Sequence, residues 1–198
     1  IYSCSLIFLI MFLIFQNGFP YSQIYDARFY TDLSGTFGNI FSKQIYFPDT
    51  YRGYLFPFII GIFSKALPLN FAIILINSLL TVFLSYYLLP NIQNVIFNRD
   101  SENNITSGVI YYFIICFFWV GYFQYVLSDI PAIVCLLTAM ILLLRHNLKA
   151  IFFSGVFLAC ALNIRPIYQI NLVLFIPFMV ILFKKDYRSY LVMLIGLY

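Results

Sequence analysis

The sequence predicts an all-α protein: a polytopic transmembrane helix bundle with an outer loop that carries interfacial helices after the first span. Hydrophobic residues make up 63% of the 198 residues and charged residues only 9%, whereas soluble domains contain about 25% charged residues. Long apolar runs recur along the chain, separated by clusters of charged and turn-forming residues. Most of the chain must therefore be solvated by lipid, which excludes a water-soluble globule and a disordered chain.

The apolar runs predict the spans in order. Full spans are expected at 71–89, 108–127, 130–144, 150–164 and 167–183, and partial spans at 1–15 and 190–198. The first run lacks a basic segment and a small-residue cleavage site, which favours a truncated span over a signal peptide. Because the chain opens on Ile1 and ends inside an apolar run, we expect 1–198 to be a single transmembrane domain and a fragment of a longer protein. The spans are expected to break at Pro90-Asn91, 98–104, Ser128-Asp129, Arg145–Asn147, Arg165-Pro166 and Lys184–Asp186.

Basic residues in the loops predict the orientation of the spans. Loops 90–107, 145–149 and 184–188 lie on one side, because two spans separate each loop from the next. They hold six basic residues against one on the opposite side, which places them in the cytoplasm. The six are Arg99, Arg145, Lys149, Lys184, Lys185 and Arg188. Asp129 and Arg165 then face the outside of a multi-pass protein of the cell membrane, most simply a bacterial inner membrane.

A long outer loop is predicted at 17–69. Within it, the apolar stretch 53–67 has only 15 residues and measures about 22 Å as a helix, against about 30 Å of hydrocarbon. This favours an interfacial or re-entrant helix over a full span. Upstream, apolar side chains recur at helical spacing and predict a helix lying in the membrane surface, with an aromatic-rich irregular loop as the alternative. They are Phe29, Tyr30, Leu33, Phe37, Ile40 and Phe41.

Two charged residues are predicted to sink slightly into the outer face of the membrane. Asp129 precedes Arg145 by 16 residues and Lys149 precedes Arg165 by 16, and each spacing is about 24 Å of helix. Asp129 and Arg165 therefore lie at similar depth on neighbouring helices. Charges in lipid usually face a polar cavity and indicate a site. A structural salt bridge, or side chains that snorkel to water, is the alternative.

Two more charged residues in the outer loop have two readings each. Asp26 follows the first span closely, among aromatic residues, so it is either a helix N-cap or a general base at the membrane face. Arg52 introduces the short apolar helix. Its guanidinium either binds a phosphate or anchors that helix among lipid headgroups.

Other chemistries lack a pattern in this sequence. The four cysteines stand far apart inside apolar runs, and His146 is the only histidine, so no metal site or disulfide framework is predicted. No Asp-x-Asp pair supports a divalent metal, and no cofactor is expected. The net charge of +4 is too small and dispersed for nucleic-acid binding.

The order of these features resembles the GT-C superfamily of membrane glycosyltransferases, of the protein O-mannosyltransferase and aminoarabinose-transferase type. The similarity covers nearly the whole chain. The segments that carry it are Asp26–Tyr30, Arg52–Pro57, Tyr125–Pro131 and Gly155–Pro166. The usual His-Pro-Pro-like or Pro-Pro-Leu start of the short helix is absent, and Tyr-Arg-Gly-Tyr stands there.

The resemblance implies an inverting transfer of a sugar from a polyprenyl-phosphate donor to a glycan, lipid or protein acceptor. Asp26 would act as general base, and Arg165, with Arg52, would stabilise the leaving phosphate. Asp129 would orient Arg165 or the acceptor. Tyr30 and Tyr54, which stand in the matching segments, would contact substrate.

Three other functions stay open. A polysaccharide polymerase or ligase of another membrane fold also combines many spans with a charged outer loop, but that loop tends to fall late in the chain. A transporter would require charged or broken helices near the membrane midplane. The polar residues in the middle of the predicted spans, such as Asn77 and Ser78, are uncharged. A structural or assembly role is the third.

Overall fold

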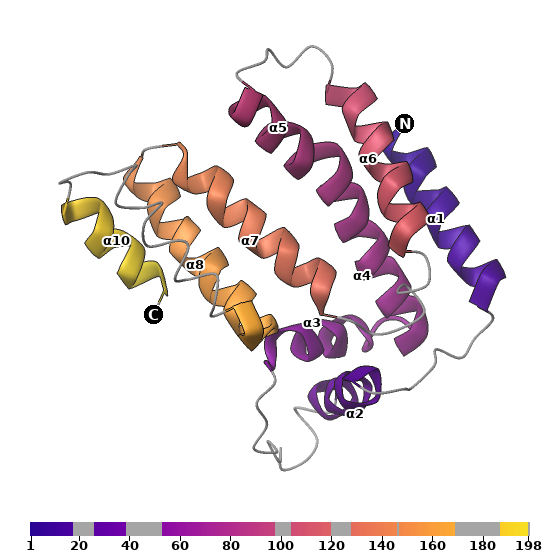
Figure 1. The fold of residues 1–198 in the computed structure, drawn as a ribbon. Coiled ribbons are helices and arrows are strands. Elements are labelled where there is room, and N and C mark those ends of the chain that lie inside the picture. The colour runs from indigo at the N-terminus through magenta and orange to yellow at the C-terminus, as the bar shows by residue number, and fades with distance from the viewer. Residues whose placement is uncertain are drawn as a thin grey trace. The chain divides into compact units, whose positions relative to one another are not determined.

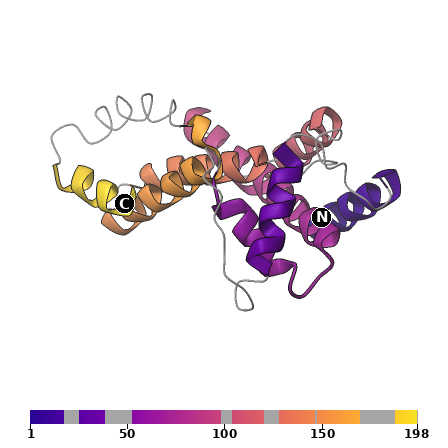
Figure 2. The same cartoon turned by 90° about the horizontal axis from the view of Figure 1, so that it is seen from below.

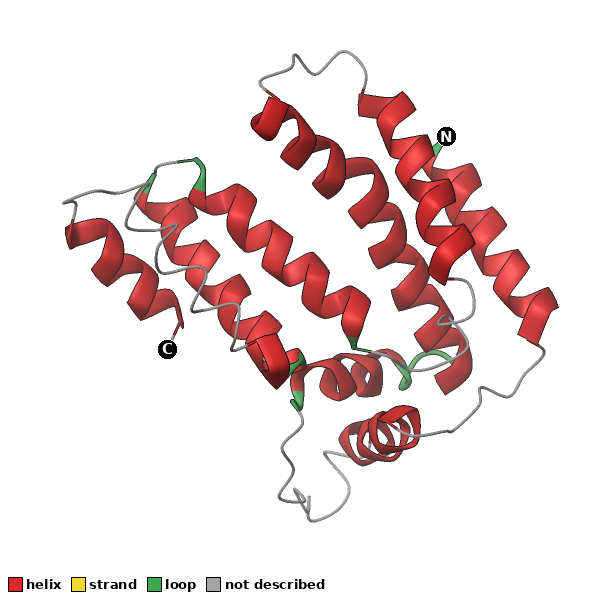
Figure 3. Cartoon of the chain, viewed as in Figure 1, coloured by secondary structure: helices red, strands yellow, loops and turns green. Residues whose placement is uncertain are grey.

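The computed structural model describes residues 1–17, 26–38, 53–97, 104–119, 128–145, 147–168 and 187–197. Every regular element among these residues is a helix, which confirms the all-α prediction (Figure 3). The chain divides into two compact units. Unit 1 comprises Ile1–Asp49 and Tyr54–Ile130, and unit 2 comprises Thr50–Gly53 and Pro131–Tyr198. The single transmembrane domain over 1–198 stays a prediction.

Unit 1 is built around one long helix. Helix α4 (Leu69–Phe83), a π-helical turn η1 (Leu84–Leu88) and α5 (Leu89–Phe97) follow one another without a break. Helix α1 (Tyr2–Asn17) packs on α4, and α6 (Asn104–Trp119) packs on η1 and α5 (Figure 1). These helices form a small bundle whose apolar side chains face one another.

The predicted break at Pro90-Asn91 is wrong, because the helix continues through both residues to Phe97. A proline lacks the N–H group of a helical residue, and its ring clashes with the carbonyl one turn earlier. The π-helical turn accommodates this: the N–H of Leu89 donates to the carbonyl of Leu84, five residues back. The side chain of Asn91 then donates to the carbonyl of Tyr87 at 2.7 Å.

The long helix has the length and composition of a membrane span. Leu69–Phe97 contains 29 residues, about 44 Å of helix, and is the one helix in the described ranges that passes this test. The predicted spans at 130–144 and 150–164 are occupied by shorter apolar helices, as are the described parts of 1–15, 108–127 and 190–198. Most of the run 167–183 lies outside the described residues.

Two short helices lie at the end of unit 1 where α1 ends and α4 begins. Helix α2 (Asp26–Gly38) runs crosswise to the bundle, and α3 (Leu55–Phe63) lies beside it (Figure 2). The nine residues of α3 measure about 14 Å, so α3 is too short to cross a bilayer. The interfacial placement of both helices stays a prediction.

The pattern predicted for the surface helix holds in α2. Tyr30, Leu33 and Phe37 are buried on one face, whereas Asp32 is exposed. The ring of Phe37 meets the ring of Phe58 in α3 edge to face, with centroids 5.5 Å apart. An irregular loop is therefore excluded for residues 26–38, while Ile40 and Phe41 lie outside the described residues.

Hydroxyl groups join the three bundle helices of unit 1. The Tyr86 hydroxyl, on the π-helical turn, lies 2.7 Å from the Ser5 hydroxyl of α1. Tyr112 of α6 donates to the Ser5 carbonyl at 2.8 Å. Gly108 lets α6 approach, because a Cβ there would lie 2.5 Å from Cδ1 of Tyr86. The π-helical turn thus presents a tyrosine at the point where three helices meet.

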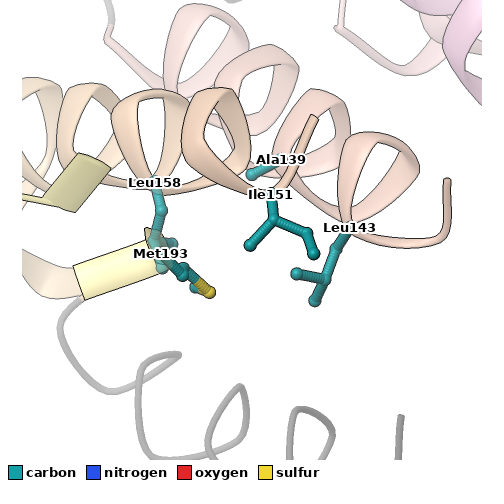
Figure 4. Close-up of a cluster of buried hydrophobic side chains, with 5 residues drawn as sticks. All are labelled: Ala139, Leu143, Ile151, Leu158 and Met193. Atoms are coloured by element: carbon teal, nitrogen blue, oxygen red, sulfur yellow. The ribbon is translucent and has the colours of Figure 1, made fainter. Parts of the chain in front are cut away.

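Unit 2 consists mainly of a helical hairpin and a third helix. Helix α7 (Asp129–Leu143) belongs to unit 2 from Pro131 onward, and it ends just before the break predicted around Arg145. Helix α8 (Leu148–Ile164) begins just after that break. Ser154 of α8 donates to the Ala139 carbonyl of α7 at 2.7 Å. Helix α10 (Tyr187–Leu197) packs on α8, and buried side chains from all three helices form one core (Figure 4). The core residues are Ala139, Leu143, Ile151, Leu158 and Met193.

A pair of glycines permits the close contact of α8 with α10. A Cβ at Gly155 would overlap the Met193 carbonyl oxygen and lie 3.0 Å from Cα of Gly196. We expect Gly155→Leu to lower the free energy of unfolding by about 1–3 kcal/mol or more, because neither backbone can move away without losing the packed core. Thermal unfolding of the full-length protein in detergent measures the change.

Gly35→Ala is the matched control, since a Cβ on this helical glycine of α2 would meet no atom within 4 Å. Alanine is the better helix former, by about 1 kcal/mol, so the control should be neutral or stabilising. Equal unfolding midpoints for Gly155→Leu and the wild type would contradict the tight contact.

Candidate functional site

A buried hydrogen bond joins helix α2 to the start of α7. The hydroxyl of Tyr30 lies 3.0 Å from the hydroxyl of Ser128, which is 98 positions away in the sequence. The two side chains are only 3% and 2% exposed. The Tyr30 ring also meets Phe56 of α3 edge to face, with centroids 6.0 Å apart. Three segments that are distant in sequence therefore meet at one point of unit 1.

This contact gathers the two predicted acidic residues at one end of unit 1. Asp26 begins α2, and one helical turn, a rise of about 6 Å, separates it from Tyr30. Asp129 follows Ser128 directly and is the first residue of α7. The side chain of Asp129 is half-buried. We call Asp26, Tyr30, Ser128 and Asp129 the acidic end of unit 1.

The start of α7 suits a carboxylate. The first backbone N–H groups of a helix have no partner within it, and the helix dipole favours negative charge at this end. Asp129 occupies the first turn of α7. An acidic residue at this position therefore stabilises the start of α7, whether or not its side chain also takes part in a reaction.

Arg165 terminates α8 in unit 2. It is the C-cap residue, with an extended backbone (φ −142°, ψ 97°), and its N–H donates to the Ala161 carbonyl at 3.0 Å. The short 3₁₀ turn η4 (Pro166–Tyr168) follows. The side chain of Arg165 is half-buried. A cation at a helix C-terminus is stabilised by the dipole, so the fold holds a guanidinium at this end of α8.

The segment that follows Arg52 lies against this same helix end. Gly53 is buried, and a Cβ at its position would coincide with the backbone carbonyl of Asn163. Only glycine fits there. Arg52 lies outside the described residues, but its neighbour in the chain contacts a residue two positions before Arg165. We call Gly53, Asn163 and Arg165 the basic end of unit 2.

The remaining predicted substrate contact is Tyr54. It is the N-cap residue of α3 and is half-buried, and its carbonyl accepts the N–H of Phe58 at 2.9 Å. Its backbone therefore starts the short helix whose Phe56 supports Tyr30. Tyr30 itself is buried, with its hydroxyl on Ser128, so it supports the acidic end from within.

Three members of these clusters were not singled out in the sequence. Ser128 stands among the turn-forming residues at a predicted break, Gly53 begins the predicted short apolar stretch, and Asn163 lies inside a predicted span. Each acquires its role from a partner far away in the chain. In the described part of the chain, no group of three His, Cys, Asp or Glu side chains lies close enough to hold a metal ion.

The sequence matches no protein-family model, no curated protein and no solved structure. The candidate site of this chain consists of an acidic end in unit 1 and a basic end in unit 2.

Gly53→Ala is expected to release the segment after Arg52 from the end of α8, because the new methyl group overlaps the Asn163 carbonyl. Trypsin cleaves after arginine, and Gly53, the residue after Arg52, is buried. We expect the fragment ending at Arg52 to appear at least about tenfold faster in the variant, corresponding to about 1.4 kcal/mol of lost protection. Mass spectrometry of timed digests measures the rate. Gly35→Ala should digest like the wild type, and so should Gly53→Ala if the contact does not exist.

Proposed function

We propose that this chain forms the catalytic part of a multi-pass membrane glycosyltransferase. It would move a sugar from a polyprenyl-phosphate donor to an acceptor at the outer face of the bacterial inner membrane, with inversion at the anomeric carbon. The observation that carries the proposal is the Tyr30–Ser128 hydrogen bond. It joins the helix that begins with Asp26 to the residue before Asp129, which supports placing the two acidic residues at one end of unit 1.

Exposed apolar side chains support a membrane location beyond the single long helix. On α6, Phe117 is 79% exposed, and Phe113 and Phe118 are also exposed. Helices α1 and α10 present similar faces, with exposed Ile7, Phe8, Met11, Leu191, Leu194 and Ile195. Soluble monomers rarely expose large contiguous apolar patches. Lipid on these faces accounts for the pattern, although α1, α6 and α10 have fewer than 18 described residues each.

The acidic end supplies the base for the proposed reaction. The acceptor hydroxyl oxygen attacks the anomeric carbon while the bond from that carbon to the phosphate oxygen breaks. Asp26 takes the hydroxyl proton, and the polyprenyl phosphate leaves with the bonding electrons. Asp129, one residue after Ser128, orients the acceptor through its carboxylate. Tyr30 and Ser128 hold the two segments together.

The basic end suits the leaving group. A dianionic phosphate forms on the lipid as the bond to the sugar breaks, and a guanidinium matches phosphate geometry with two parallel hydrogen bonds. Arg165 is fixed at its backbone by the end of α8, and the Gly53 contact brings the chain that follows Arg52 to the same helix end. As the resemblance to GT-C enzymes implies, Arg165 would bind the phosphate, with Arg52 as the second donor.

The test uses full-length protein in lipid nanodiscs. It is incubated with synthetic polyprenyl phosphates that each carry a radiolabelled hexose, pentose or amino sugar, together with an extract of cell-envelope lipids and glycans as acceptor. We expect one donor class to lose its label to the extract while free polyprenyl phosphate accumulates. No label transfer and no phosphate release from any of these donors would contradict the proposal.

A further inference from the structure

The inner face of α4 carries a row of polar side chains in the only described helix of membrane-spanning length. Asn77, Ser78 and Thr81 of α4 are buried in unit 1, and the row continues with the buried Ser85 of η1. In hydrocarbon, a buried polar atom without a hydrogen bond costs free energy, because no bulk water can replace its partner. Each member of this row therefore needs a hydrogen-bond partner inside the bundle.

Two members bond to their own helix. The hydroxyl of Thr81 donates to the Asn77 carbonyl and that of Ser85 to the Thr81 carbonyl, each at 2.8 Å. Thr138 in α7 does the same with the Val134 carbonyl at 2.7 Å. Bonding one turn back is the usual solution for a hydroxyl on an apolar helix.

The other two members have no such solution. Among the described residues, neither Oδ1 of Asn77 nor Oγ of Ser78 has a hydrogen-bond partner. The residues are 3% and 0% exposed. The carbonyl of Ile74 lies one turn before Ser78, where Thr81 and Ser85 find their partners, but Ser78 does not bond to it. These adjacent residues thus present an acceptor and a hydroxyl group inside the bundle.

We infer that Asn77 and Ser78 bind an ordered internal water within unit 1. Water donates to the Asn77 oxygen and either donates to or accepts from the Ser78 hydroxyl, which meets the needs of both groups. Burial of both residues leaves no path for a side chain of another protein. The apolar surroundings and two neutral groups do not suit an ion. The inference concerns the fold and is independent of the proposed glycosyl transfer.

Isosteric substitutions in the full-length protein test the inference. We expect Asn77→Leu and Ser78→Ala each to lower the midpoint of thermal unfolding in nanodiscs by about 2–6 °C, because each removes a satisfied bond to water. Thr81→Val is the control, since it removes a buried hydroxyl that bonds only to its own helix, and it should change the midpoint by less than about 2 °C. If the two groups had no ligand, apolar replacements would raise the midpoint or leave it unchanged. Either result would overturn the inference.

A second measurement separates lost water from altered packing. A structure of the wild-type protein at a resolution that shows ordered solvent should contain density within about 3.2 Å of Asn77 Oδ1 and of Ser78 Oγ. The same density should disappear in Ser78→Ala or lose occupancy in Asn77→Leu. A wild-type map without solvent density at these atoms would overturn the inference, whatever the unfolding midpoints.

Discussion

Replacing Asp26 by Asn should lower the rate of sugar transfer by about 10²–10⁴-fold, the range by which a positioned general base accelerates proton transfer. Asparagine keeps the size of the side chain and the start of α2, but it cannot accept the proton of the acceptor hydroxyl. The affinity for the donor should change little, because the base contacts the acceptor. Initial rates of polyprenyl-phosphate release at saturating donor measure the loss.

The matched control is Asp32→Asn, on the same helix. Asp32 is exposed, whereas Leu33 and Phe37 of the same helix are buried, so its replacement should leave transfer within about twofold of the wild type. Thermal unfolding of both variants shows whether either change disturbs α2, because an N-terminal carboxylate also stabilises a helix by up to about 1 kcal/mol. Wild-type turnover in Asp26→Asn would dismiss this residue as the base.

The helical spacing of apolar residues allowed parts of the fold to be predicted from the sequence. In α2, the spacing of Tyr30, Leu33 and Phe37 indicates one buried helical face, and these three side chains are buried in the structure. This spacing can be read from the sequence because it relates only residues about one helical turn apart. The helix boundaries at Asp129 and Arg165 were predictable for a similar local reason, since charge and proline interrupt an apolar run.

Pro90 shows where local rules fail. A proline in an apolar run predicts a helix end, but the π-helical turn from Leu84 to Leu88 shifts the hydrogen-bond register and the helix continues. No residue pattern in the sequence predicts this turn. The turn is stabilised by a tertiary contact, because Tyr86, within it, lies at hydrogen-bond distance from Ser5 of a different helix.

The candidate site was predictable residue by residue but not as an assembly. Asp26, Asp129 and Arg165 stand out because charged residues near apolar runs are costly and therefore informative. Ser128 and Gly53 do not stand out, since their meaning comes from Tyr30 and Asn163, 98 and 110 positions away along the chain. A single sequence does not indicate which distant residues contact each other, so the contacts that join these segments are seen only in the structure.

Arg165→Ala should lower the rate of transfer by about 10²–10³-fold, the typical loss when one group that stabilises developing charge is removed. The guanidinium is expected to act on the leaving phosphate, whose negative charge grows as the bond to the sugar breaks. Unlike the loss of the base, this change should also weaken inhibition by free polyprenyl phosphate, because the product carries the charge that Arg165 binds. Transfer rates and product-inhibition constants are measured on the same nanodisc samples.

Arg165→Lys separates charge from geometry. Lysine keeps the positive charge at the end of α8 but lacks the planar pair of donors, so we expect an intermediate rate, with most of the product inhibition retained. Arg145→Ala is the matched control. Arg145 is an exposed arginine just after the end of α7, on the side predicted to be cytoplasmic, and its replacement should leave both quantities unchanged. Unchanged product inhibition in Arg165→Ala would remove Arg165 from the phosphate site even if the rate fell, because a group that binds the leaving phosphate must bind the free phosphate too.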